Sequence, residues 1–240
     1  MTVEHQLIYY FYRINPVHSC GGLGATVSGP FTIMRVTSYV DGFNLYHSVV
    51  DIGINHYKWL DLWKLSEIYA PKPNFTLTAV YYFSALAHWL PGPCSRHQIY
   101  IEALKATGVT PILGNFKEKD RSCNRCGKTW KSHEEKETDV NLAIHLLSGA
   151  YDNTYDTAFV ISGDSDLSQA IKLVLDKFPH KQIKVIIPPG LQLTSQIRTS
   201  VGGINNCRQM KEIHLERSLL PATINTGTAV INRPHDYDPP

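Results

Sequence analysis

The chain has 240 residues, of which 43% are hydrophobic and 18% charged, and its formal net charge is +2. This composition is typical of a globular protein and excludes a largely disordered one, and the length favours one α/β core with appendages. The sequence has neither the run of about 18 to 20 apolar residues needed to span a bilayer nor a signal peptide, so it predicts a soluble, cytoplasmic protein without membrane contact.

The first 33 residues show no sustained helical or strand period, and their glycines and proline favour a poorly ordered leader at 1–33. A β-prone run then covers residues 35–40 and ends at a polar, glycine-containing turn, Asp41-Gly42-Phe43-Asn44. The pattern continues with a strand at 77–83, a helix at 95–107 that Gly108 ends, and a strand at 110–116.

The second half of the chain repeats this alternation. It predicts a helix at 134–147, a strand at 157–161, a helix at 167–177 and a strand at 182–187. A C-terminal helical extension is expected at 191–220, with its last helix at 209–220, and residues 221–240, rich in Thr, Asn and Pro, are expected to be a disordered tail.

Strands that alternate with helices predict a mainly parallel sheet covered on both faces, because a parallel connection needs a long crossover. The fold class is therefore α/β, a three-layer α/β/α Rossmann-like arrangement. Loops at the carboxyl ends of such strands hold the functional site. Asp41 and the pair Asp164 and Asp166 all follow predicted strands, so we expect them at the same edge of the sheet.

Residues 162–166, Ser-Gly-Asp-Ser-Asp, leave the buried strand through a glycine that allows a tight turn. Their carboxylates suit Mg²⁺ or Mn²⁺, which prefer oxygen ligands. The alternative is a polar turn that caps the next helix. Asp41 and Asp139, which are expected to converge on the same region, favour the metal site, because clustered carboxylates repel one another without a cation.

Three segments carry a family resemblance: residues 39–45, 135–140 and 162–167. In this order they resemble an NYN domain of the PIN-like nuclease superfamily, over about residues 34–190. The resemblance implies a Rossmann-like fold and a metal-dependent ribonuclease that uses Mg²⁺ or Mn²⁺ to cleave RNA. It assigns the metal to Asp41, Asp139, Asp164 and Asp166, the lining of the site to Asn44 and Ser162, and the substrate phosphate to Lys136.

The secondary assignments have structural alternatives that the sequence leaves open. Lys136 could be a solvated helix charge paired with a neighbouring glutamate. Asn44 could serve only as a helix cap, and Ser162 could satisfy only a turn.

The chain has five cysteines, an odd number, and Cys123 and Cys126 form a CxxC pair within an insertion at about 117–133. With His133 as a third ligand they could bind structural Zn²⁺, although a fourth ligand is not identified. Two ordinary reduced thiols are the alternative, and a disulfide framework is disfavoured in a chain of this size.

The same insertion gathers basic residues around Trp130: Lys117, Lys119, Arg121, Arg125, Lys128 and Lys131. Cations that neutralise phosphates, together with an indole that stacks on a base, favour single-stranded RNA as the partner. The alternative is a solvated loop with a packed Trp130, since Glu118, Asp120, Glu134 and Glu135 are interspersed.

Two other functions compete with this interpretation. A haloacid-dehalogenase-like phosphatase requires a second acid two residues after Asp41, where this chain has Phe43. A catalytically inactive RNA-binding or scaffolding module of the same fold is disfavoured by the intact acidic set. The sequence leaves open the class of RNA, whether DNA is cut and whether the protein forms a homodimer.

Overall fold

The structure is a computed structural model that describes residues 33–240. The leader expected at 1–33 lies, apart from its last residue, outside the described part. The core is a seven-stranded sheet in the order β4-β3-β2-β1-β5-β6-β7, in which only β4 runs antiparallel to its neighbour. The strands are β1 (Met34–Asp41), β2 (Phe75–Ala85), β3 (Thr110–Ser122), β4 (Thr129–Lys136), β5 (Thr157–Ile161), β6 (Gln182–Ile187) and β7 (Cys207–Gln209).

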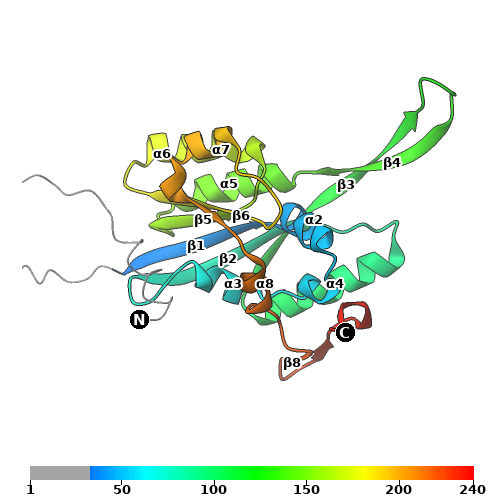
Figure 1. Cartoon of the computed structure of the whole chain (residues 1–240), viewed down its shortest axis with the longest axis horizontal. Coiled ribbons are helices and arrows are strands. Elements are labelled where there is room, and N and C mark those ends of the chain that lie inside the picture. The colour runs from blue at the N-terminus through cyan, green and yellow to red at the C-terminus, as the bar shows by residue number, and fades with distance from the viewer. Residues whose placement is uncertain (1–32) are drawn as a thin grey trace, which may run out of the picture. The chain divides into compact units, whose positions relative to one another are not determined.

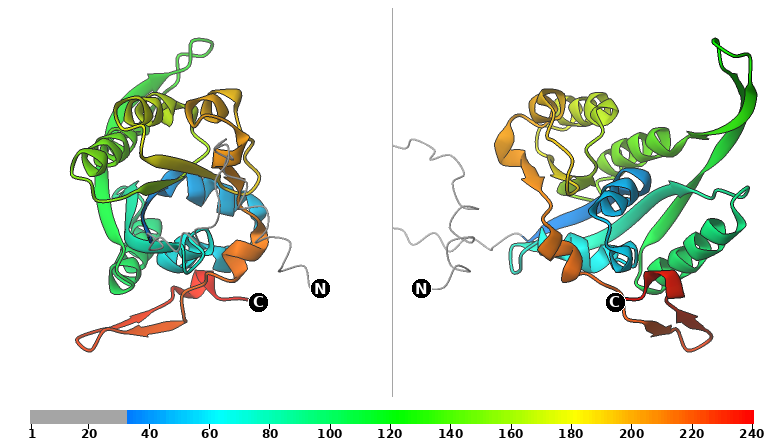
Figure 2. Two further views of the ribbon diagram at one scale, coloured as in Figure 1. Left: turned by 90° about the vertical axis from the view of Figure 1, so that its left-hand side faces the viewer. Right: turned by 45° about the vertical axis from the view of Figure 1, so that its right-hand side comes forward.

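Helices cover both faces of this sheet (Figures 1 and 2), which confirms the three-layer α/β/α class. One face carries α2 (Gly42–Ile52), α3 (Leu62–Ile68), α4 (Pro91–Ala106) and α8 (Glu212–Glu216). The other carries α5 (Thr138–Tyr151), α6 (Ser168–Lys177) and α7 (Ser195–Ser200). None of the helices described between residues 33 and 240 is long and apolar enough to cross a membrane.

Strand alternation divides the sheet residues between two apolar cores. In β1, Val36 and Val40 point to the core under α2, α3 and α4, whereas Tyr39 points to the core under α5 and α6. All five residues of β5 are buried because this strand is covered on both faces, which explains its uninterrupted apolar run.

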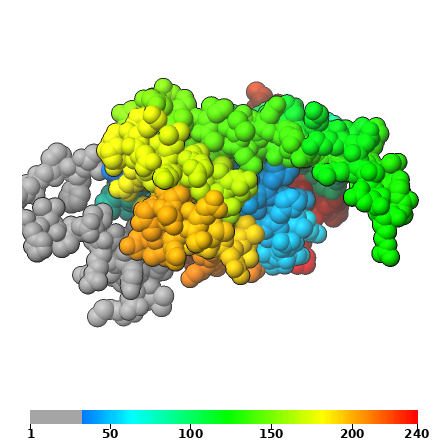
Figure 3. Space-filling model, turned by 90° about the horizontal axis from the view of Figure 1, so that it is seen from above, coloured from blue at the N-terminus to red at the C-terminus, as the bar shows by residue number. Residues whose placement is uncertain are grey.

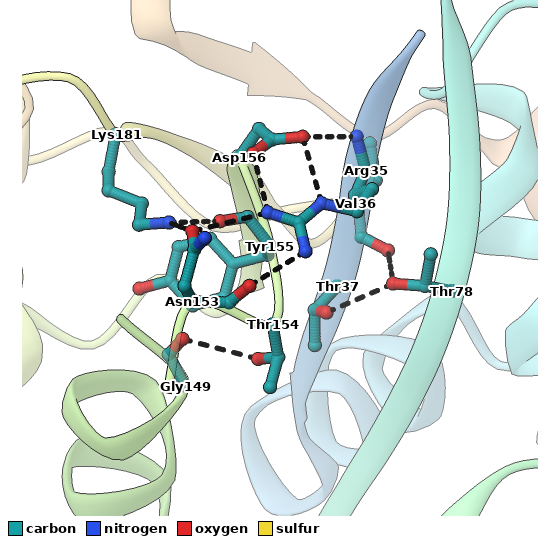
Figure 4. Close-up of polar contacts among 10 residues, drawn as sticks. All are labelled: Arg35, Val36, Thr37, Thr78, Gly149, Asn153, Thr154, Tyr155, Asp156 and Lys181. Atoms are coloured by element: carbon teal, nitrogen blue, oxygen red, sulfur yellow. Dashed lines mark hydrogen bonds and ion pairs between the residues drawn. The ribbon is translucent and has the colours of Figure 1, made fainter. Parts of the chain in front are cut away.

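A polar cluster closes the sheet at the amino ends of β1 and β5, the end opposite to Asp41 (Figure 4). The Arg35 guanidinium donates to both carboxylate oxygens of Asp156, at 3.2 and 2.8 Å, and holds the pKa of Asp156 below its usual value. Lys181, only 3% exposed, donates to the carbonyl of Tyr155 at 2.6 Å and to the side chain of Asn153. These partners satisfy the buried charge, so we assign the cluster a structural role.

Two expected elements differ from the structure near the 117–133 insertion. The segment is a β-hairpin in which β3 and β4 form eight residue pairs. It extends beyond the helices (Figure 1) and projects at one end of the space-filling view (Figure 3). The helix expected at 134–147 begins only at Thr138, because residues 134–136 pair with β3 and Glu137 adopts a left-handed φ of 79° that ends the strand. The turn expected at 41–44 is the first turn of α2.

The C-terminal expectations are also corrected. Only Glu212–Glu216 of the helix predicted at 209–220 is α-helical. The predicted disorder of 221–240 is wrong, because this segment forms β8 (Thr223–Asn225), β9 (Val230–Asn232) and a 3₁₀ turn at His235–Tyr237. Trp59, 0% exposed, donates from Nε1 to the carbonyl of Pro221 at 2.9 Å, and Tyr237 joins the same apolar cluster. The segment is ordered by contacts that its own composition does not reveal.

Candidate active site

The carboxylates of the predicted site lie at the carboxyl ends of β1 and β5 and at the start of α5. Asp41 is the last residue of β1 and the N-cap of α2, and it is only 3% exposed. Its Oδ1 accepts from the backbone N–H of Asn44 at 3.0 Å, and its Oδ2 accepts from the hydroxyl of Ser162 at 2.8 Å. Both carboxylate oxygens are therefore oriented by neighbours.

Two further hydrogen bonds join the first and third sequence motifs. The N–H of Gly163 donates to Oδ1 of Asn44 at 2.8 Å, and the N–H of Asp164 donates to the hydroxyl of Ser162 at 3.0 Å. Asn44 and Ser162 thus hold the turn after β5 against Asp41. Asn44 also lies in the first turn of α2, and Ser162 also accepts a hydrogen bond within its own turn. The structure places both of these predicted site residues beside the carboxylates.

Asp164 and Asp166 have different positions. Asp164 is half-buried and caps the 3₁₀ turn Ser165–Leu167, since its Oδ1 accepts from the N–H of Asp166 at 2.9 Å. Asp166 itself is exposed. The helix-capping alternative therefore holds for Asp164, and Asp166 lies at the edge of the site.

The acidic groups affect one another's protonation. Burial raises the pKa of Asp41 above its usual value, the hydrogen bonds from Asn44 and Ser162 oppose this, and the charges of Asp164 and Glu135 add to it. Burial, together with the charges of four carboxylates, raises the pKa of Asp139 to about 6; the four are those of Asp41, Asp164, Glu135 and Asp166. The site is a concentration of negative charge in a partly buried place.

Asp41, Asp139 and Asp164, here named the carboxylate site, offer only oxygen donors that repel one another. This donor set fits Mg²⁺ or Mn²⁺. Within residues 33–240, no group of three or more His, Cys, Asp or Glu side chains is arranged to hold a metal ion. Mg²⁺ often keeps several waters and binds through one or two carboxylates, so it does not require such a group.

Glu135 is a site residue that the sequence reasoning does not select. It lies on β4, and its Oε1 accepts from the N–H of Thr138 at 2.9 Å, which caps the start of α5. Its charge raises the pKa of both Asp41 and Asp139. The signal in the sequence that could have identified it is an acid just before a helix, which can accept a hydrogen bond from one of the unsatisfied N–H groups of the first turn.

The structure does not bring Lys136 to the carboxylates. Its ammonium pairs with Glu134 at 3.2 Å, on the side of the β4 strand opposite to Glu135. The structure thus contains the alternative for this lysine, an ion pair with a neighbouring glutamate. Both residues lie on a strand and not on a helix. Trp130, 50% exposed, lies across the hairpin from Arg121 and away from the carboxylates.

The expected zinc site loses its third ligand. Cys123 and Cys126 lie at the hairpin tip, where backbone N–H groups of Arg125 and Cys126 lower the pKa of the Cys123 thiol. His133 pairs with Glu118 five residues along β3 from Cys123, about 16 Å at strand spacing, and it stacks on Trp89 with ring centroids 3.7 Å apart. His133 as a ligand is therefore wrong, and a cysteine pair remains.

The chain is similar to known proteins in sequence and in fold. The chain is 22% identical over 192 residues to 6-hydroxy-3-succinoylpyridine 3-monooxygenase HspA of Pseudomonas putida, a match that covers 65% of this chain and 60% of that protein. The chain thus matches less than two thirds of this relative's length. A crystal structure of a Vibrio parahaemolyticus protein of unknown function shares the fold, with a TM-score of 0.52 and 17% identity over 81% of this chain and 100% of that one.

Residues 35–196, which include both strand-end motifs and the start of α5, match the model of the NYN domain. The chain therefore belongs to the NYN domain family of the PIN-like nuclease superfamily.

Proposed function

We propose that the carboxylate site hydrolyses phosphodiester bonds of RNA with the help of Mg²⁺ or Mn²⁺. The observation that carries this proposal is the convergence of Asp41, Asp139 and Asp164 at one edge of the sheet, with a pKa of about 6 for Asp139. Such mutual repulsion is relieved by a divalent cation. When bound, the cation would activate water and stabilise the charge that develops on the phosphate.

The chain's own residues have separate roles in this reaction. Asp41 and Asp164 would hold the cation. Asn44 and Ser162 orient the Asp41 carboxylate and hold the backbone of Gly163 and Asp164 beside it. Asp139, whose carboxylate lies close enough to Asp41 and Asp164 for their charges to act on it, would accept the proton that the attacking water loses.

The decisive experiment compares Asp164→Asn with Asp176→Asn, a matched change at an exposed position of α6. Labelled RNA is incubated with each purified variant in Mg²⁺, Mn²⁺ or EDTA. We expect Asp164→Asn to lose cleavage by at least about 10²-fold and Asp176→Asn to keep wild-type activity. Cleavage that survives EDTA, or that survives Asp164→Asn, contradicts the proposal.

Metal binding can be measured without cleavage. A cation that binds only the folded state raises the unfolding temperature, by mass action. We expect millimolar Mg²⁺ or Mn²⁺ to stabilise the wild type, and to stabilise Asp41→Asn much less. Equal stabilisation of both proteins would remove Asp41 from the metal site.

A second candidate function is the oxidation of a small aromatic compound. It is favoured by a cavity of about 240 Å³ between α2 and α4, next to Asp41, and by the relative whose name describes a monooxygenase of a substituted pyridine. The cavity is rich in aromatic side chains: Phe43, Tyr46, Tyr57, Tyr82, His97, Tyr100 and Tyr237. Hydroxylation would place one atom of O₂ on the ring and release the other as water, with electrons from a reduced nicotinamide or flavin. Consumption of that reductant only when a hydroxylated pyridine is added, by a protein that leaves RNA intact, would favour this candidate.

A further inference from the structure

The hairpin of β3 and β4 separates its charges between two faces. Because successive side chains of a strand point to opposite sides, the register of the eight residue pairs assigns each residue to one face. The first, here named the basic face, consists of Asn115, Lys117, Lys119, Arg121, Trp130, Ser132, Glu134 and Lys136. The second, here named the acidic face, consists of Phe116, Glu118, Asp120, Ser122, Thr129, Lys131, His133 and Glu135.

The two faces have opposite formal charges. The basic face has four cations and one acid, a net +3, whereas the acidic face has three acids and one lysine, a net −2 with His133 neutral. Acids that are interspersed in the sequence are thus not interspersed on the surface. The interspersed acids therefore do not neutralise the cations of the basic face, which could still bind the phosphates of a nucleic acid.

The cations of the basic face are incompletely neutralised. Its single acid, Glu134, is shared by Lys119 and Lys136, which together lower the pKa of Glu134 to about 2. Lys117 and Arg121 form no ion pair with any residue between 33 and 240. The acidic face differs, since Lys131 and His133 both pair with Glu118.

The two faces also differ in what covers them. On the acidic face, Trp89 stacks on His133 and contacts Phe116, so the body of the protein occupies its base. On the basic face, the Trp130 ring is 50% exposed and lies directly across from Arg121. An exposed indole beside unpaired cations is the combination that binds unstacked bases and their phosphates.

The basic face ends next to the start of α5, whereas Glu135, the hairpin residue whose charge acts on Asp41 and Asp139, belongs to the acidic face. At the base of the basic face, Nδ2 of Asn115 donates to Glu137 at 3.0 Å, and Glu137 is the N-cap of α5, whose first turn contains Asp139. The eight residues of β4, at about 3.3 Å each, give a track of about 26 Å from the hairpin tip to this point.

We propose that the basic face binds single-stranded RNA, and the choice of RNA as the ligand rests on the proposed function. Phosphates would lie along Lys117, Lys119 and Arg121, and an unpaired base would stack on Trp130. A duplex does not fit this chemistry, because its bases are already stacked and paired.

The test uses matched variants on the two faces of one hairpin. Arg121→Glu on the basic face and Lys131→Glu on the acidic face make the same charge change. Binding of a fluorescently labelled 12-nucleotide RNA is measured by anisotropy in EDTA, so that no cleavage occurs. We expect Arg121→Glu and Trp130→Ala each to weaken binding by about 10-fold or more and Lys131→Glu to change it by less than about 2-fold. The slope of log Kd against log salt should fall by about 1 for Arg121→Glu.

Equal losses for Arg121→Glu and Lys131→Glu, or tighter binding of duplex than of single-stranded RNA, would overturn the proposal. The same measurement is made with single-stranded DNA of the same sequence. Tighter binding of this DNA than of the RNA would also overturn the proposal. Circular dichroism and urea unfolding confirm that each variant is folded.

Failure of this surface and failure of the hydrolytic function give different results. If the variants bind RNA in the expected pattern but the wild-type protein never cleaves it, the proposed RNA-binding surface stands and the proposed nuclease activity is wrong. Protein that cleaves RNA but binds equally well after Arg121→Glu and Trp130→Ala retains the nuclease and loses the surface.

Discussion

The hydroxyl of Ser162 donates to Oδ2 of Asp41 at 2.8 Å and so joins the carboxyl ends of two neighbouring parallel strands, β1 and β5. The same hydroxyl oxygen accepts from the N–H of Asp164 at 3.0 Å. A single side chain therefore orients the carboxylate of Asp41 and holds the backbone of Asp164, the two residues that we assign to the cation. Because Asp41 is nearly fully buried, its carboxylate depends on such donors for its charge.

Ser162→Ala should therefore disturb Asp41 without adding bulk. Loss of a hydrogen bond to the charged form raises the pKa of Asp41 further, so the acidic limb of the pH–rate profile should move to higher pH. The free energy of unfolding should fall by about 1–3 kcal/mol. Ser165→Ala, three residues further on, is the matched control and should leave the profile in place. An unmoved acidic limb in Ser162→Ala would show that this bond does not set the protonation of Asp41.

Gly42→Ala should be strongly destabilising. A Cβ at Gly42 would lie 2.5 Å from the carbonyl oxygen of Phe83 and 2.5 Å from the Tyr82 ring, so β2 would have to move away from α2. We expect a loss of at least about 1–3 kcal/mol in urea unfolding, together with loss of activity. Gly92→Ala, where the nearest atom is a flexible Arg96 nitrogen at 3.6 Å, should be close to neutral. Similar stabilities for the two variants would contradict the close approach at Gly42.

Tyr237→Ala tests whether the last 20 residues belong to the folded protein. Tyr237 packs in the cluster of Trp59, Ala103 and Leu220, and its removal should lower the free energy of unfolding by about 2 kcal/mol or more. His235→Ala, at a side chain that is 97% exposed, should change stability by less than about 0.5 kcal/mol. If the tail were disordered, neither substitution would have an effect.

His97 should make the protein sensitive to acid. Burial lowers the pKa of His97 to about 4, from its usual value of 6.5, and Nε2 lies 3.0 Å from the hydroxyl of Tyr82. Between these two values the unfolded chain binds more protons than the folded one, so stability rises with pH from about 4 to 6.5 and is lost as pH falls through this window. The contribution of this one group is on the order of 2 kcal/mol.

The matched variant is His97→Gln, which keeps a polar side chain and removes the titration. We expect its free energy of unfolding to fall less than that of the wild type between pH 6.5 and pH 4.5. Parallel pH profiles for the two proteins would assign the acid sensitivity to other groups.

The strand and helix pattern of the core could be predicted because it depends on residues that are close along the chain. The apolar run at 157–161, the glycine that follows it and the period of the helix after residue 167 are local signals, and they predicted β5 and α6 closely. The convergence of Asp41 and Asp164 also followed, because parallel strands end at the same edge of a sheet.

The hairpin and the tail could not be predicted in the same way. Residues 134–136 continue into a helical pattern, but they pair with β3, and only this pairing places Glu135 near Asp41 and Lys136 on the opposite face. The tail is polar and rich in proline, and it is ordered by Trp59, a residue more than 150 positions earlier.

The sequence by itself determined the family, the α/β class and the identity of the acids at the strand ends, because turn chemistry and apolar period depend on residues that are close along the chain. Only the tertiary structure decided which charges share a surface and which acids approach one another. It also showed that His133 lies too far from Cys123 to bind the same metal ion. The hydrogen bond from Ser162 to Asp41 spans 121 residues, and contacts at such separation arise from strand register and packing, which no local pattern specifies.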